Sequence, residues 1–336
     1  GINKEDLKEY LKNKLYLSYS SLDTYNKCGF RFYLSNILKL DIYEETFGAY
    51  IGSLFHYVLQ KCLDSDSPIE NEIQNFIKEA GKPLNNKEQF YVNKLKKELY
   101  KLVEFLKEQK NDTELTDFMF EKKIKIEKSN KLDIYFSGII DKIMYKELDD
   151  KIIMSLIDYK TYKLETDLRL MKYGLNMQLP IYLLLSKELS NKKILYSGFY
   201  TEQILNNSIN KAETDLYKLN GYSNCDKEII GMFDKTYEES KYISGLKVKK
   251  DGDFYASSKV LNNNEIENII SYAETKVDET IENILEATFD INPKYTTKNI
   301  SCEFCNFKDI CYMKEKDIEN IKAETNLDFI GGDINA

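Results

Sequence analysis

The chain has 336 residues with 42% hydrophobic and 31% charged side chains, and its formal net charge is −8 at pH 7. These fractions are those of a globular protein and exclude a long disordered or repetitive chain. The longest apolar run, residues 179–185, is far shorter than the roughly 20 residues of a membrane helix, and the N-terminus has no apolar signal region. We therefore expect a cytoplasmic protein with no membrane segment.

The length fits one elaborated domain, which we place at residues 1–325, followed by a tail at 326–336. Because the chain begins with Gly, we expect it to be an excised piece of a longer protein or a stand-alone relative of one. The negative net charge argues against a general nucleic-acid binder. Two local runs, 121–131 and 241–250, are nevertheless basic, and either could be a phosphate-binding surface or a solvated lysine face.

The N-terminal third has helical patterns. Ser18, Ser20 or Ser21 can cap a helix at about residues 21–28, and apolar residues three and four apart predict an amphipathic helix at 47–63. His56, the only histidine, lies at the edge of that apolar stripe, as a hydrogen-bonded rim residue or as a metal ligand. Residues 64–120 are mostly helical in pattern, which we interpret as a helical elaboration.

A sheet is expected next. Residues 124–141 alternate apolar and polar side chains around a turn at 129–131, and a polar turn at 147–151 precedes a further strand at 152–160. Alternation places Asp158 and Lys160 on one face of that strand and Ile157 and Tyr159 on the other. If Asp141 ends the preceding strand, the hairpin brings both carboxylates and the lysine together, as in a metal-dependent nuclease centre.

The C-terminal half is expected to contain a helix after Gly174 in which Gln178 and Tyr182, four residues apart, share a face. Gln178 could equally satisfy the backbone of a strand in a core helix. Further expectations are a strand at 193–205, irregular chain at 206–260 with turns at 220–225 and 249–253, and a helix at 264–289.

Three closely spaced cysteines form a C-x2-C-x5-C pattern near the C-terminus, and a fourth thiolate is needed to complete a metal or cluster site. The segment 300–313 supplies Cys302, Cys305 and Cys311, and Cys28 is the candidate fourth ligand. The spacing does not exclude zinc. The remaining two, Cys62 and Cys225, are expected to be ordinary buried residues.

The chain resembles the RecB-like branch of the PD-(D/E)XK nucleases, and most closely the C-terminal nuclease domain of AddB-type subunits. The resemblance is carried, in the order of the family, by SYSSLDTYNKCGFRFYL, GSLFHYVL, GIIDK, LIDYKT, GLNMQLPIYLL, SGLKVKKDGDFYASSKVL and CEFCNFKDIC. It implies an α/β, restriction-endonuclease-like fold with a mixed central sheet flanked by helices.

The resemblance also implies the cofactors and the residues that hold them. A [4Fe–4S] staple would join the N- and C-terminal regions through Cys28, Cys302, Cys305 and Cys311. Mg²⁺ or Mn²⁺ would be bound by His56, Asp141, Asp158 and the backbone carbonyl of Tyr159. Lys160 would orient the attacking water or offset charge, while Gln178 and Tyr182 would hold DNA and the active centre in register. Lys142 stands where the family usually has arginine, so we expect a weakened phosphate contact there.

The implied function is a metal-dependent DNA exonuclease acting on single-stranded ends during double-strand break repair, with an AddA-type helicase-nuclease subunit as partner. Two alternatives remain open at this point. One is a catalytically silent iron–sulphur module that binds DNA ends or acts as a scaffold. The other is a CRISPR-associated RecB-like nuclease, although those proteins are much shorter.

Overall fold

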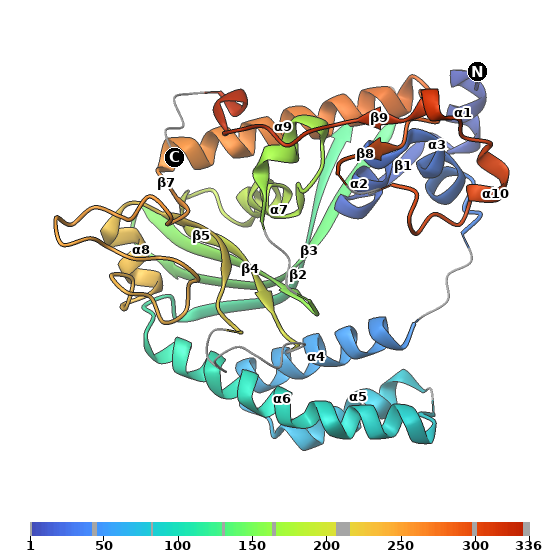
Figure 1. The fold of residues 1–336 in the computed structure, drawn as a ribbon. Coiled ribbons are helices and arrows are strands. Elements are labelled where there is room, and N and C mark those ends of the chain that lie inside the picture. Colours follow the sequence, from blue (N-terminus) through green and yellow to red (C-terminus); the bar gives the residue numbers. More distant parts are fainter. Residues whose placement is uncertain are drawn as a thin grey trace.

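A seven-stranded mixed sheet forms the centre of the fold (Figure 1). The structure, a computed structural model, describes residues 2–41, 46–81, 83–129, 132–162, 166–205, 216–297 and 301–331. The strands follow the order β1-β3-β4-β5-β6-β7, and β2 pairs with the other edge of β3. Their bounds are β1 Lys14–Ser18, β2 Asp117–Ser129, β3 Asp133–Glu147, β4 Lys151–Lys160, β5 Lys193–Gln203, β6 Asn220–Asn224 and β7 Val260–Leu261. A separate two-stranded sheet joins β8 Lys294–Tyr295 to β9 Glu319–Asn320.

Helices cover both faces of the sheet. One apolar cluster packs α2, α7 and α9 against it, and a second packs α4, α5, α6 and α8 against the opposite face (Figure 1). The helices are α1 Lys4–Tyr10, α2 Tyr19–Lys27, α3 Gly29–Phe32, α4 Phe47–Asp64, α5 Ile69–Ala80, α6 Asn86–Asn111, α7 Gln178–Ser186, α8 Lys227–Phe233, α9 Asn263–Leu285 and α10 Lys308–Cys311. None of the helices in the described ranges is long and apolar enough to span a bilayer.

Local sequence explains most of these elements. Ser18 caps α2 in a reciprocal capping box with Ser21, so the helix begins two residues earlier than expected. The apolar stripe of α4 is buried along its length, as its spacing predicted. The expected hairpin is confirmed, since β2 and β3 pair antiparallel, although residues 130–131 of its turn lie outside the described residues.

Three expectations about the elements are wrong. Residues 220–224 form β6 instead of a turn, because Gly221 allows close pairing: a Cβ there would lie 2.1 Å from the carbonyl oxygen of Phe199. The helical elaboration stops at Asn111, so residues 117–120 belong to β2. The described part of the tail is packed, since Leu327 and Ile330 are buried in the cluster that contains α9.

Candidate active site

The two strands that carry the carboxylates are shifted at Asp141. Before it, Phe136 and Ile140 face the α7 and α9 side, whereas Met144 beyond it faces the α4 and α6 side. Asp141 therefore lies in the middle of β3, six residues before its end, and not at the end of a strand as expected. It still lies next to β4, because the backbone N–H of Tyr159 donates to Asp141 Oδ2 at 2.7 Å.

The shift has a partner on the adjacent strand that sequence reasoning missed. Glu121 of β2 lies between Phe120, which pairs with Lys142, and Lys122, which pairs with Ile140, so it is directly opposite Asp141. Its φ of 47° is left-handed, a conformation that costs a non-glycine residue roughly 1–3 kcal/mol and is concentrated at functional sites. Only the side chain's charge was readable from the sequence, where it merged into a basic run.

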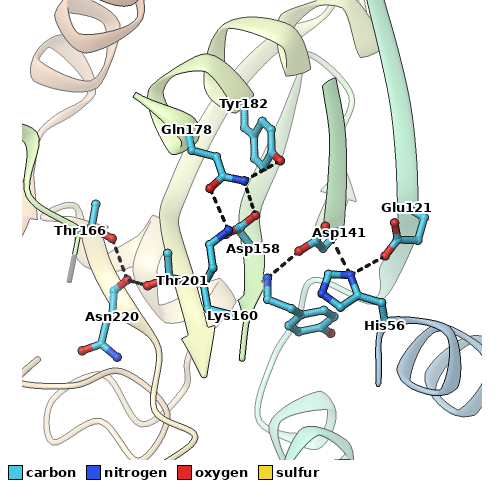
Figure 2. A network of polar contacts seen from close by, with 11 residues as sticks. His56, Glu121, Asp141, Asp158, Lys160, Thr166, Gln178, Tyr182, Thr201 and Asn220 are labelled. Atoms are coloured by element: carbon cyan, nitrogen blue, oxygen red, sulfur yellow. Dashed lines mark hydrogen bonds and ion pairs between the residues drawn. The ribbon is translucent and has the colours of Figure 1, made fainter. Parts of the chain in front are cut away.

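The second carboxylate is held by a chain of polar contacts from β4 to α7 (Figure 2). Lys160 Nζ lies 2.6 Å from Asp158 Oδ2 and donates to Gln178 Oε1 at 2.8 Å. Gln178 Nε2 donates to Asp158 Oδ1 at 2.8 Å and to the Tyr182 hydroxyl at 2.9 Å. Gly138 lets α7 approach β3, because a Cβ there would lie 2.6 Å from Leu185 Cδ1. The expected grouping of Asp158, Lys160, Gln178 and Tyr182 is therefore present in the structure.

The histidine reaches the site from α4. His56 Nδ1 lies 3.0 Å from Glu121 Oε1 and 3.7 Å from Asp141 Oδ1 (Figure 2). Its ring meets the Tyr159 ring edge-on, with the ring centres 5.5 Å apart. Of the two interpretations of His56, the structure favours a ligand, since potential metal-ligating atoms of His56, Glu121 and Asp141 lie within 4.8 Å of one another.

The electrostatics of the site favour a bound cation. Burial raises the pKa of Asp141 and of Asp158 above their usual range, and the Asp158 charge raises the pKa of Asp141 further. Burial alone would lower the pKa of His56, but the hydrogen bond to Glu121 and the charge of Asp141 raise it. Carboxylates that resist ionisation side by side are stabilised by a cation between them, and this oxygen-rich donor set with one imidazole fits Mg²⁺ or Mn²⁺.

Lys142 does not face the site, and the expected phosphate contact is therefore wrong. Its side chain is 2% exposed and donates to Gln109 Oε1 of α6 at 3.4 Å, on the opposite face of the sheet. The alternation shift at Asp141 turns it inward, so it cannot reach DNA. No local sequence signal indicated that shift.

The four cysteines that were grouped by spacing line one hollow between the chain ends. Cys28 joins α2 to α3, and its surroundings are held to the C-terminal segment by Phe30 N–H donating to the Asp290 carbonyl at 2.8 Å and Ser301 Oγ donating to the Lys27 carbonyl at 2.8 Å. The hollow includes Cys28, Cys302, Cys305 and Cys311. Burial raises the pKa of the Cys302 thiol, and the other three cysteines raise it further, as expected for neighbouring sulphurs. Cys62 is buried in the α4 cluster, as expected, whereas Cys225 is half-buried.

A mixed sheet that carries two carboxylates and a lysine on adjacent strands, with helices on both sides, defines a metal-dependent phosphodiesterase type of fold and site. Residues 16–312 match the family model of the PD-(D/E)XK nuclease superfamily, and the chain belongs to that superfamily. The resemblance inferred from the sequence motifs is thus confirmed at the level of the family and of the fold.

Curated relatives match the whole chain at low identity. A protein of Clostridium perfringens strain SM101 is 27% identical over 406 residues, which cover 100% of this chain and 34% of the relative. Relatives from Staphylococcus saprophyticus and Anoxybacillus flavithermus are 26% and 22% identical and cover 88% and 94% of this chain. All three are named as a subunit of an ATP-dependent helicase/deoxyribonuclease. The chain spans about a third of the length of these relatives.

Proposed function

We propose that this chain is a Mg²⁺- or Mn²⁺-dependent DNA exonuclease module that cuts single-stranded ends during double-strand break repair. The observation that carries the proposal is the contact chain joining Asp158 to Lys160 and Gln178 beside Asp141. A silent DNA-end-binding module would have no need of this complete set. The names of the relatives support an AddA-type helicase-nuclease subunit as partner and a cytoplasmic location.

The residues that would hold the metal are His56, Asp141, Asp158 and the Tyr159 carbonyl, with Glu121 as an additional carboxylate. When bound, the divalent cation supplies Lewis-acid polarisation of a phosphate and lowers the pKa of a water molecule. The chain itself supplies orientation: the Tyr159 amide fixes Asp141, and Gln178 fixes Asp158 from α7.

Lys160 is suited to meet the substrate. Its side chain is 20% exposed whereas that of Asp158 is 2% exposed, so the ammonium lies at the surface of the cluster while the carboxylate lies beneath it. A fixed positive charge at that point offsets the charge that develops on a phosphate during cleavage. Gln178 accepts a hydrogen bond from Lys160 and prevents the ammonium from turning away.

The test compares Lys160→Ala with Lys151→Ala, which changes a lysine at the far end of the same strand. With 5′- and 3′-end-labelled single-stranded DNA and Mn²⁺, we expect Lys160→Ala to abolish cleavage and Lys151→Ala to leave it unchanged. Equal cleavage by both variants, after removal of contaminating nucleases, would refute the catalytic assignment. Binding of DNA ends without cleavage by the unaltered protein would favour the silent module.

We also propose that Cys28, Cys302, Cys305 and Cys311 hold a [4Fe–4S] cluster that ties the chain ends together. In the described chain no three cysteine sulphurs lie within 4.8 Å of one another, whereas a ZnS₄ tetrahedron with bonds of about 2.3 Å has sulphurs roughly 3.8 Å apart. This wider spacing supports a larger group than a single zinc ion.

The cluster is tested by anaerobic purification, visible absorbance and metal analysis. We expect a brown protein with about four iron atoms per chain, which Cys302→Ser loses and Cys225→Ser, as control, retains. A colourless protein with stoichiometric zinc would overturn the assignment.

A further inference from the structure

One region of the sheet is covered by a helix on only one side. Before the shift at Asp141, alternate residues of β1, β2 and β3 face away from the α7 and α9 cluster, and we call them the tyrosine face. It consists of Lys14, Tyr16, Lys123, Lys125, Tyr135 and Ile139. Tyr16 is 68% exposed and Ile139 is 46% exposed, which is unusual for the middle of a central sheet.

The aromatic side chains of this face form a stack with one open end. Tyr16 and Tyr135 are directly opposite each other on β1 and β3, with ring centres 4.9 Å apart and planes 19° from parallel. Lys125 Nζ covers the Tyr135 ring at 4.0 Å from its centre. Both sides of the Tyr135 ring are thus occupied, and the outer side of the exposed Tyr16 ring remains available for a planar ligand.

A groove adjoins Tyr16 at the edge of the sheet and is basic. Its lining includes Tyr10, Lys12, Lys14 and Lys39 as well as Tyr16, and contains no Asp or Glu. The three lysines are exposed, and none forms an ion pair with another residue of the described chain. The carboxylates closest along the tyrosine face are Glu127, which is paired with Lys125 at 2.7 Å, and Asp133, which is opposite Lys14. The surface is therefore locally positive in a protein whose net charge is −8.

The face leads directly to the catalytic aspartate. Tyr135 and Ile139 precede Asp141 on β3, and six residues of strand separate Tyr135 from Asp141 by roughly 20 Å. A chain of stacking bases and regularly spaced phosphates matches an open aromatic ring flanked by lysines.

We propose that the tyrosine face and its groove bind the single-stranded DNA that continues from the active site, with one base stacked on Tyr16 and phosphates contacted by Lys12, Lys14 and Lys39. This inference rests on the proposed nuclease function and specifies how its substrate is held. Continuity with the catalytic aspartate and the absence of carboxylates in the groove lining favour DNA over a protein segment as occupant.

The first experiment measures binding separately from cutting. In the Asp158→Asn background, fluorescence anisotropy with labelled oligothymidine of about 16 nucleotides gives dissociation constants. We expect Tyr16→Ala to weaken binding about 10-fold or more, Tyr16→Phe to restore it, and Tyr255→Ala, an exposed tyrosine elsewhere, to have no effect. Replacing Lys12, Lys14 and Lys39 by Ala should reduce the slope of log K against log salt by about 2. Unchanged dissociation constants for Tyr16→Ala would overturn the proposal and leave this face to a protein partner.

The second experiment separates this inference from the nuclease function. A p-nitrophenyl ester of thymidine monophosphate is too short to reach Tyr16, so Tyr16→Ala should hydrolyse it at the unaltered rate while degrading long single strands more slowly. If Tyr16→Ala degrades long strands as fast as the unaltered protein does, the proposed track is wrong although the nuclease assignment stands. If the unaltered protein cuts neither substrate, the nuclease assignment fails, and the binding measurement still decides the fate of the track.

Discussion

Two clusters of charged side chains lie on opposite faces of the same strands and differ in almost every physical respect. The catalytic cluster around Asp141 and Asp158 is reached by solvent through Lys160 and has hydrogen-bond partners from β4 and α7. The second cluster, Lys142 and Glu202, is sealed beneath α6, with exposures of 2% and 0%. Neither carboxylate oxygen of Glu202 has a hydrogen-bond partner among the described residues.

The difference shows that neighbours in sequence can have opposite tasks. Lys142 follows Asp141, and Glu202 is opposite Tyr159 across β4 and β5, yet the second cluster contacts no solvent and cannot meet substrate. Burial raises the pKa of Glu202 to about 7, and Lys142 counteracts that rise, whereas burial lowers the pKa of Lys142. We infer that the catalytic cluster trades stability for chemistry and that the sealed pair affects stability alone.

The largest effect is expected from Asp158→Asn. Cleavage of DNA should fall at least about 10³-fold, because the carboxylate that Lys160 and Gln178 hold would be neutral. In EDTA the free energy of unfolding should stay the same or rise by about 1 kcal/mol, since a buried charge is removed. Gel assays and urea denaturation measure the two quantities, with Asp150→Asn in the exposed turn as control. A loss of stability together with retained cleavage would reverse the comparison.

Breaking the sealed pair should have the opposite outcome. Lys142→Met leaves Glu202 without its counter-charge and is expected to cost about 3–5 kcal/mol of unfolding free energy. The double variant Lys142→Met with Glu202→Met should recover most of that loss, because the pair is then replaced by apolar side chains of similar size. Lys146→Met, which removes a surface ion pair with Glu114 on the same strand, should cost at most about 1 kcal/mol. Equal losses for the single and double variants would show that the pair is not coupled.

Local patterns predicted the parts of the site that depend on local geometry. The two-residue period of β4 placed Asp158 and Lys160 together, and the helical period after Gly174 placed Gln178 and Tyr182 on one face of α7. Cysteine spacing grouped Cys302 with its neighbours because the segment is short. These features need no knowledge of distant contacts.

What could not be predicted depends on how distant segments meet. The shift at Asp141 and the left-handed Glu121 arise from two strands changing faces at the same level, and no residue type announces it. The same shift turns Lys142 inward. Gly221 suggested a turn, but its role is to allow close pairing with β5, which is visible only once both strands are in place.

A smaller, pH-dependent effect tests whether Glu202 is the source of instability in Lys142→Met. A folded-state pKa of about 7, above the ordinary 4.5, stabilises the protein below pH 4.5 and loses that contribution as pH rises toward 7. Without Lys142 the pKa of Glu202 rises further, so unfolding free energy should fall more steeply between about pH 5 and pH 8, by up to about 1.4 kcal/mol per pH unit. Adding Glu202→Gln should remove the extra slope in urea titrations; parallel curves for Lys142→Met and the unaltered protein would contradict the assignment.

The smallest effect is expected at the edge of the catalytic cluster, from Tyr182→Phe. The hydroxyl accepts one of the two hydrogen bonds that Gln178 Nε2 donates, and the other bond to Asp158 remains. Cleavage should therefore fall only about 2- to 10-fold, with at most about 1 kcal/mol of lost stability. Burial and the Asp158 charge raise the pKa of Tyr182 far above its usual range, so the hydroxyl stays protonated and positions Gln178 without exchanging protons. The pH–rate profile of Tyr182→Phe should keep its shape; a lost limb in that profile would instead assign the hydroxyl a direct part in proton transfer.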